Sequence, residues 1–194
     1  MRAITFEEFL QLTKNSDSHF EFLNNRPYLM PSPSDPHQMI SKNLTTLFEN
    51  FLLNKKCQLR EAPYDVFLGD QKHVVCPDIC VICDTSKITV RGCVGAPDLI
   101  IEILSPSSLQ RDLSIKHNLY FEHGVREYWV VVPKFETINV YTVEDGGYHE
   151  KCYEHPGTIY PTIFPSLPVR TEFVFGTMPG KESVAYIKGI LDLN

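Results

Sequence analysis

The chain of 194 residues is 43% hydrophobic and 11% aromatic, which is enough apolar material for one domain, residues 1–194, with a sizeable core. A formal net charge of −6 argues against a broad basic surface for nucleic acid, although a local basic strip or a bound metal ion would still allow phosphate to bind. No apolar run approaches the roughly 18 to 20 residues of a membrane span, and the start of the chain lacks the basic-then-apolar layout of a signal peptide. We therefore expect a cytoplasmic protein without a membrane partner.

The chain contains six cysteines, and the lack of an export signal favours reduced, buried thiols over disulfides. The spacing of Cys76, Cys80, Cys83 and Cys93 lacks the paired knuckles of a structural zinc site. Strand alternation would also turn Cys83 away from Cys76 and Cys80. We therefore expect neither stoichiometric zinc nor a disulfide.

The first elements in chain order are expected to be a short helix and a hairpin. Residues 5–12 read as a helix with Thr5 as N-cap and Glu8 as its capping-box partner. Alternation of apolar and polar residues over residues 19–30 predicts a hairpin that turns at Asn24-Asn25.

A long helix should follow, because apolar side chains recur at helical spacing over residues 36–56. Asp35 is expected to be its N-cap, with Pro36 at the first helical position. Lys55 and Lys56 are expected to end it, since cations are favourable at the negative end of the helix dipole.

Residues 57–68 and 74–83 are both strand-like and are separated by Gly69-Asp70, so they should pair as a hairpin. The second of these strands carries Asp78. A helix is predicted after Pro106, with Ser107 as N-cap, Gln110 as its capping-box partner and Gly124 as its stop. The elements predicted after this helix are a buried strand at 127–132, a hairpin of 138–143 with 148–153, strand and loop over 158–175, and a small helix from Lys181.

The central strand is expected at residues 99–104, where nearly every residue is apolar, as in a strand covered on both faces. Glu102 interrupts this run, and alternation places it on the same face as Asp98. With Asp78 on a neighbouring strand, Glu102 would form a pair of carboxylates that can hold Mg²⁺ or Mn²⁺, and the two acids would repel each other without the ion. Alternatively, hydrogen bonds at the strand ends neutralise both acids.

Lys116 follows Asp112 by four residues, which is typical of an exposed ion pair on a helix. Because such a pair contributes little, Lys116→Ala would leave the melting temperature nearly unchanged. Alternatively, Lys116 reaches back over the end of the preceding strand toward Glu102.

His37 reads most simply as a surface histidine, but it could serve as an acid, base or ligand, and Glu21 is the acid nearest to it in sequence.

Four motifs occur in order along the chain. They are V-C-P-D-I around Asp78, A-P-D-L-I-I-E-I-L-S-P-S-S around Glu102, R-D-x-x-x-K ending at Lys116, and G-V-R-E-Y-W-V-V from Gly124. This series resembles the Uma-type restriction endonuclease family of bacteria, which belongs to the PD-(D/E)XK nuclease superfamily. The resemblance covers about residues 5–176 and leaves 177–194 as a C-terminal extension. It implies an α/β (α+β) fold with a restriction-endonuclease-like core, in which a mixed β-sheet is flanked by helices.

By position, the resemblance implies that Asp78 is the metal-binding aspartate and Glu102 is the acid of the E-x-K element. The lysine position two residues after Glu102 holds Leu104, and Lys116 matches the place to which the lysine has moved in this family. Other acids and a histidine also match family positions and are expected to support the site, namely Glu21, His37, Asp98 and Asp112.

The implied activity is metal-dependent hydrolysis of DNA by an endonuclease that uses Mg²⁺ or Mn²⁺ and acts as a homodimer. The rival reading is a catalytically inactive DNA- or protein-binding relative with the same fold. The acidic net charge and the missing in-strand lysine favour that rival, whereas the joint presence of Asp78, Glu102 and Lys116 favours the enzyme.

Overall fold

Two six-stranded sheets form the body of the protein in the computed structural model, which describes residues 2–69, 72–105 and 111–194. The central sheet has the order β12 (Gly147–Glu154), β11 (Thr137–Glu144), β10 (Glu127–Val132), β9 (Leu99–Ile103), β6 (Ile79–Ile82), β3 (Gln58–Glu61). The second sheet has the order β2 (Arg26–Leu29), β1 (Phe20–Leu23), β5 (His73–Val75), β4 (Val66–Leu68), β8 (Gly92–Val94), β7 (Ile88–Thr89). The short strands β13 (Thr158–Ile159) and β14 (Val169–Arg170) pair with each other.

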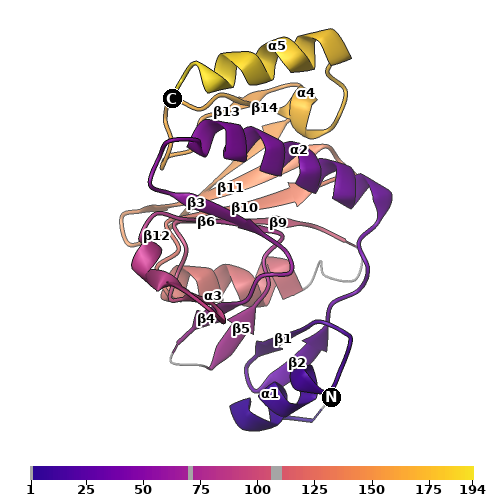
Figure 1. The fold of residues 1–194 in the computed structure, drawn as a ribbon, viewed down its shortest axis with the longest axis vertical. Coiled ribbons are helices and arrows are strands. Elements are labelled where there is room, and N and C mark those ends of the chain that lie inside the picture. The colour runs from indigo at the N-terminus through magenta and orange to yellow at the C-terminus, as the bar shows by residue number, and fades with distance from the viewer. Residues whose placement is uncertain (1, 70–71, 106–110) are drawn as a thin grey trace.

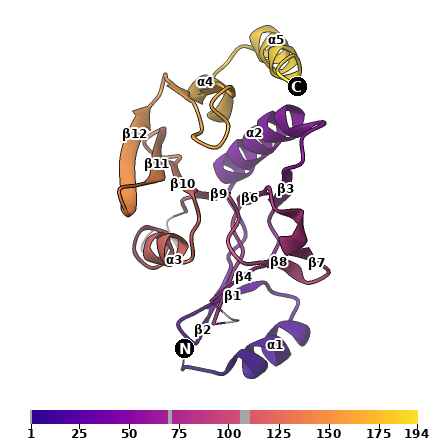
Figure 2. The ribbon, with the colours of Figure 1, turned by 90° about the vertical axis from the view of Figure 1, so that its left-hand side faces the viewer.

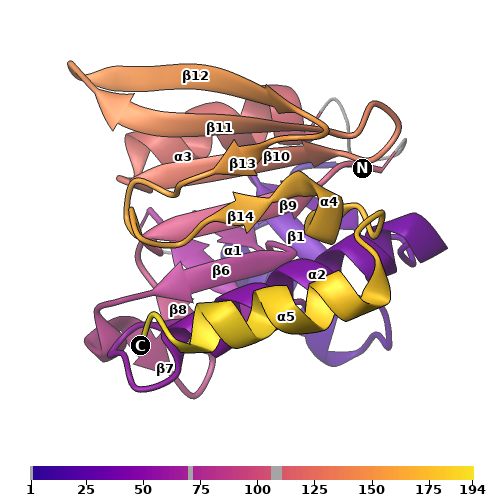
Figure 3. The same cartoon turned by 90° about the horizontal axis from the view of Figure 1, so that it is seen from above.

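Helices α2 (Asp35–Leu52) and α3 (His117–Glu122) cover opposite faces of the central sheet. The other helices are α1 (Phe6–Lys14), α4 (Thr171–Val174) and α5 (Gly180–Leu191), with a 3₁₀ turn at Thr85–Lys87 and a π-helical turn at Arg111–Lys116. Helix α2 lies on one face, whereas α3 and the second sheet lie on the other (Figure 1). The view turned by 90° shows the same layers, with α1 at the end of the molecule farthest from α5 (Figure 2). Helix α5 runs alongside α2 (Figure 3).

The first helix and hairpin form as the sequence predicts. Thr5 caps α1, and both hydrogen bonds of the capping box with Glu8 are present. The β1–β2 turn places Asn24 at φ 50° and Asn25 at φ 60°, the left-handed conformation that a tight hairpin turn requires and that asparagine tolerates.

The ends of α2 differ from the prediction. Ser34 rather than Asp35 is the N-cap, and Pro36 takes the second helical position, where its missing N–H is also harmless. The helix ends at Leu52, before the two lysines, because Asn54 adopts a left-handed φ of 65°.

The predicted hairpin of residues 57–68 and 74–83 is confirmed, but it divides between the two sheets. Its outer parts, β3 and β6, pair in the central sheet, whereas β4 and β5 pair in the second sheet. Further along the chain, Gly124 ends α3 at φ 85°, and β11 and β12 form the predicted hairpin. The predicted caps Ser107 and Gln110 lie outside the described residues.

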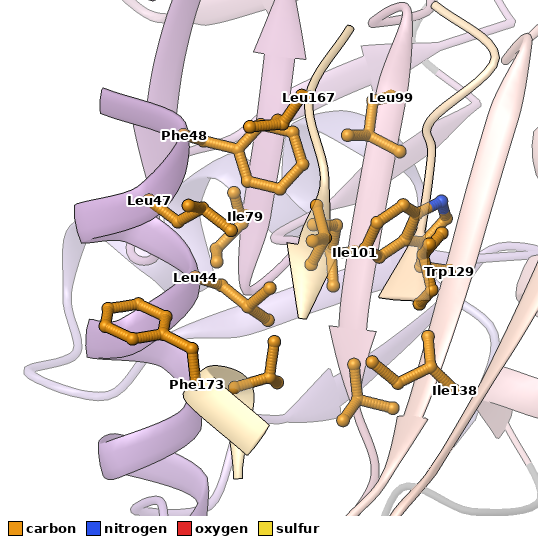
Figure 4. Close-up of a cluster of buried hydrophobic side chains, with 14 of the residues drawn as sticks. Leu44, Leu47, Phe48, Ile79, Leu99, Ile101, Trp129, Ile138, Leu167 and Phe173 are labelled. Carbon is orange, nitrogen blue, oxygen red and sulfur yellow. The ribbon is translucent and has the colours of Figure 1, made fainter. Parts of the chain in front are cut away.

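Strand β9 is buried on both faces, as predicted, and lies antiparallel to β6 and parallel to β10. On one face, Leu99, Ile101 and Ile103 join the cluster that includes side chains of α2 (Figure 4). On the other face, Ile100 joins a second cluster with Tyr120 of α3. The predicted mixed sheet flanked by helices is therefore confirmed, and Glu102 belongs to the α3 face.

The expectation that no disulfide forms is wrong, because Cys57 and Cys83 are joined in one. The register of β3 and β6 pairs Gln58 with Ile82, so the two cysteines lie opposite each other one step further, with Cα atoms 3.9 Å apart. Cellular compartment and spacing along the chain do not reveal this register.

None of the helices in residues 2–69, 72–105 and 111–194 is both long and apolar enough to cross a membrane.

Candidate functional site

A cleft of about 460 Å³ opens where the start of β6 and the end of β9 meet the β1–β2 hairpin and the first turns of α2. Side chains from distant parts of the chain meet there. The structure thereby brings together five of the seven residues that the sequence singled out, namely Glu21, His37, Asp78, Glu102 and Lys116.

Asp78 immediately precedes β6, and the antiparallel register that pairs Ile79 with Ile101 continues to place Asp78 opposite Glu102. Its Oδ2 accepts a hydrogen bond of 2.7 Å from the backbone N–H of Ile103. Its Oδ1 lies 3.1 Å from Nε2 of His37, which comes from the first turn of α2. Because an ionised carboxylate only accepts hydrogen bonds, Nε2 of His37 carries the proton in this contact.

Glu102 and Glu21 share the ammonium of Lys116. Lys116 Nζ lies 2.8 Å from Oε1 of each glutamate, and the three side chains are only 1 to 5% exposed. Glu21 also accepts a hydrogen bond of 3.1 Å from the backbone N–H of Cys76. The lysine therefore joins the β1–β2 hairpin to the central sheet through two buried ion pairs.

This geometry overturns the reading of Lys116 as half of an exposed helical pair. The chain runs through a π-helical turn that ends at Lys116, and the side chain points inward over the end of β9. Removing one partner of a buried ion pair costs about 3–5 kcal/mol, because it leaves the other charge buried without compensation. The prediction that Lys116→Ala would hardly change the melting temperature assumed an exposed lysine, and the buried contacts contradict that assumption.

Tyr120 also belongs to this cluster, although the sequence analysis did not single it out. Its hydroxyl donates a hydrogen bond of 2.7 Å to Oε1 of Glu102. The signal was present in the spacing, because Tyr120 follows Lys116 by four residues and side chains four apart share a helix face. A buried tyrosine next to apolar residues reads as core, which hides its polar contact.

The prediction that repulsion between Asp78 and Glu102 strains the metal-free protein left out these partners. Asp78 is hydrogen-bonded to His37 and to the chain at Ile103, and Glu102 contacts an ammonium and a phenol. These contacts offset the repulsion between the two carboxylates.

The donor chemistry of the cleft fits a hard divalent cation. The carboxylates of Glu21, Asp78 and Glu102 and the ammonium of Lys116 leave two net negative charges among these described side chains when His37 is neutral. Carboxylate oxygens are the ligands that Mg²⁺ and Mn²⁺ prefer. No group of three or more His, Cys, Asp or Glu side chains is arranged around a common metal position in the described ranges, so Asp78 and Glu102 would need further oxygen ligands.

Two residues predicted to support the site are not brought into the cleft. Asp98 lies at the opposite end of β9, where it accepts a hydrogen bond of 2.8 Å from the N–H of Cys83 and lies 3.4 Å from Arg126. Sharing a strand face with Glu102 did not place it near the same strand end, because four residues of strand span about 13 Å. The side chain of Asp112 lies outside the described residues.

Leu104 accounts for the missing in-strand lysine. It is 8% exposed and packs in the apolar cluster that contains Tyr120. The ammonium that the E-x-K element of the superfamily places two residues after the acid comes here from Lys116, at the end of the turn before α3.

Comparisons with known proteins show the family and the fold of the chain. A family model described as "Uma2: Putative restriction endonuclease" matches residues 6–171. The chain is 29% identical over 142 residues to "Uncharacterized protein slr1290" of Synechocystis sp., which covers 73% of this chain and 75% of that protein. The crystal structure of "a putative nuclease belonging to DUF820" from Anabaena variabilis matches with a TM-score of 0.74 at 23% identity, over 89% of this chain and 98% of that one. This last likeness shows a shared fold.

Proposed function

Because the chain belongs to the Uma2 family, we propose that it is a divalent-metal-dependent endonuclease that hydrolyses phosphodiester bonds in DNA. The observation that carries the proposal is the convergence of Asp78, Glu102 and Lys116 in one cleft. These side chains come from the start of β6, from β9 and from the turn before α3. Two carboxylates and an ammonium are the functional groups that metal-assisted hydrolysis of a phosphodiester uses.

Asp78 and Glu102 would hold the divalent ion, Mg²⁺ or Mn²⁺. When bound, such an ion polarises the scissile phosphate and lowers the pKa of a bound water. The cleft has a further need for positive charge, because a DNA phosphate would otherwise approach a group of side chains with an excess of carboxylates.

Besides the metal ion, the ammonium of Lys116 supplies positive charge to the cleft. Glu21 and Glu102 accept hydrogen bonds from its ammonium and so fix its position at the floor of the cleft. From that position it can orient an attacking water and offset the negative charge that develops on the phosphate oxygens. Glu21 therefore acts through Lys116, as a positioning residue.

His37 acts on Asp78 in a similar way. Its Nε2–H donates to Oδ1 while the N–H of Ile103 donates to Oδ2, so both oxygens of this carboxylate are oriented by the protein. This preorganisation orients the acid at the mouth of the cleft, where its side chain is 15% exposed.

The test is cleavage of supercoiled plasmid with Mg²⁺ or Mn²⁺ by the wild type, by Glu102→Gln and by Glu127→Gln. Glu127 is a matched control, because it is a fully buried glutamate on the adjacent strand β10 and is not among the described residues that line the cleft. Wild type and Glu127→Gln should nick or linearise the plasmid, whereas Glu102→Gln should lose the activity. A wild type that cuts with neither ion would overturn the proposal and favour an inactive DNA- or protein-binding relative.

The DNA substrate and the homodimer are further predictions, and each has its own test. Parallel incubations with single-stranded RNA and with plasmid separate a DNA enzyme from a general nuclease. Sedimentation of the pure protein tests the expected homodimer, which a sedimentation coefficient of a 22.3 kDa monomer at all concentrations would contradict.

A further inference from the structure

Tyr120 contacts a predicted metal ligand without being part of the cleft wall. Its hydroxyl bonds to Oε1 of Glu102, the same oxygen that lies 2.8 Å from Lys116 Nζ. The tyrosine is fully buried and is not among the described residues that line the cleft. Its hydrogen bond to the cleft is made through Glu102.

Packing fixes the tyrosine independently of Glu102. Its ring meets the ring of Tyr128 edge to face, with centroids 5.0 Å apart and an interplanar angle of 73°. Both rings belong to the apolar cluster between α3 and the central sheet. The hydroxyl is thus presented to Glu102 by a rigid part of the core.

A glutamate needs such a contact if its carboxylate plane is to be fixed. The terminal torsion of Glu is broad and roughly two-fold, so packing of the aliphatic part alone does not orient the two oxygens. Two donors on one oxygen, an ammonium from one direction and a phenol from another, restrict this torsion.

We propose that Tyr120 is a positioning residue for the divalent ion, because it fixes the carboxylate plane with which Glu102 would hold that ion. This inference rests on the proposed function, since it assigns Tyr120 a task only if Glu102 is a metal ligand. It adds a residue from α3 to a site whose other residues were suggested by the family pattern.

The hydroxyl of Tyr120 is the donor in this contact, because an ionised carboxylate only accepts hydrogen bonds.

The competing explanation is that Tyr120 is a core aromatic whose hydroxyl bonds to the nearest acceptor. In that case Tyr120→Phe would lower stability and leave metal affinity unchanged. Tyr141→Phe is a matched control, because Tyr141 is also buried, belongs to the same cluster and donates a hydrogen bond of 3.1 Å to the carboxylate of Glu150 in β12.

The experiment is a calorimetric titration of Mn²⁺ into the full chain, without nucleic acid, for the wild type, Tyr120→Phe and Tyr141→Phe. Loss of a bond that orients a metal ligand should weaken Mn²⁺ binding by Tyr120→Phe about 10- to 100-fold and leave Tyr141→Phe near the wild type. Melting curves in EDTA establish that both variants fold, which the retained phenyl ring favours.

The possible failures are distinguishable. Equal Mn²⁺ affinity in the wild type and Tyr120→Phe would overturn the positioning role and leave the proposed nuclease intact. Equal weakening in both tyrosine variants would also overturn it, because the effect would then belong to any buried phenol in this cluster. A wild type that binds no Mn²⁺ would remove the proposed function and this inference together.

Discussion

Two buried glutamates on neighbouring strands have opposite surroundings. Glu102 in β9 is 4% exposed and lines the cleft, where it contacts the ammonium of Lys116. Glu127 in β10 is fully buried and accepts hydrogen bonds from Trp129 Nε1 at 2.7 Å and from the backbone N–H of Ile163 at 3.1 Å. The first acid therefore has a cationic partner at an open site, whereas the second is satisfied by neutral donors inside the core.

The comparison shows that burial of an acid is a poor signal of function when taken alone. Neutral N–H groups are enough to accommodate Glu127, and burial still raises the pKa of this acid above its ordinary value, with Trp129 and Ile163 offsetting part of the effect. Around Glu102, a cation and two further carboxylates leave an excess of negative charge beside a cleft. Excess negative charge beside a cleft is suited to binding a cationic ligand, whereas the contacts of Glu127 with Trp129 and Ile163 are suited to stabilising the fold.

The largest expected effect is that of Lys116→Ala. It should lower the free energy of unfolding by about 3–5 kcal/mol, because Glu21 and Glu102 would stay buried without their cation. Urea denaturation measures the loss, and the exposed Lys134 serves as a control whose alanine variant should change stability by less than about 0.5 kcal/mol. Comparable small losses in both variants would break the contrast on which the comparison rests.

A smaller effect is expected from Mn²⁺ on the two glutamates. An ion that binds only the folded state at 100 times its Kd stabilises it by about 2.7 kcal/mol, so the wild type and Glu127→Gln should melt higher with Mn²⁺ than with EDTA. Glu102→Gln should lose most of this increase. If Mn²⁺ raised the melting temperature of Glu102→Gln but not that of Glu127→Gln, the roles of the two glutamates would be the reverse of those given above.

The smallest expected effect is the pH dependence of the stability of Glu127→Gln relative to the wild type. The folded state binds the proton of Glu127 more tightly than the unfolded chain does, so ionising this acid costs stability as the pH rises above its ordinary pKa of 4.5. Glu127→Gln lacks this proton, and its stability relative to the wild type should therefore rise between about pH 4 and pH 7. Urea midpoints of both proteins at the two pH values give the difference, and a flat difference would contradict the effect of burial.

Much of the fold follows from local patterns in the sequence. The capping box at Thr5 and the Asn24-Asn25 turn depend on residues a few positions apart, and the nearly continuous apolar run of β9 predicts that both of its faces are buried. The ends of α2 were less predictable, because any residue of the first turn tolerates proline and because Asn54 competes with the lysines as a stop signal.

The site was predictable only in part, for reasons of geometry. The apolar run around Glu102 identified it as an acid in need of a partner, and the family pattern pointed to Asp78 and Lys116. The partner of a buried group is set by tertiary register, which is why Tyr120 was missed and Asp98 was expected too close to the site. The same limit applies to the disulfide, since the pairing of Cys57 with Cys83 follows from which strands become neighbours.

The shared ammonium also has a consequence for the time at which the site is completed. Glu21 leaves the ribosome with the first hairpin, but Lys116, the cation that it contacts, lies in a later part of the chain, beyond α2 and β9. Domains fold as units once enough of the chain has emerged, so a nascent chain that ends before Lys116 has the carboxylates without the ammonium. The buried ion pairs of the cleft are therefore completed only after Lys116 has been synthesised.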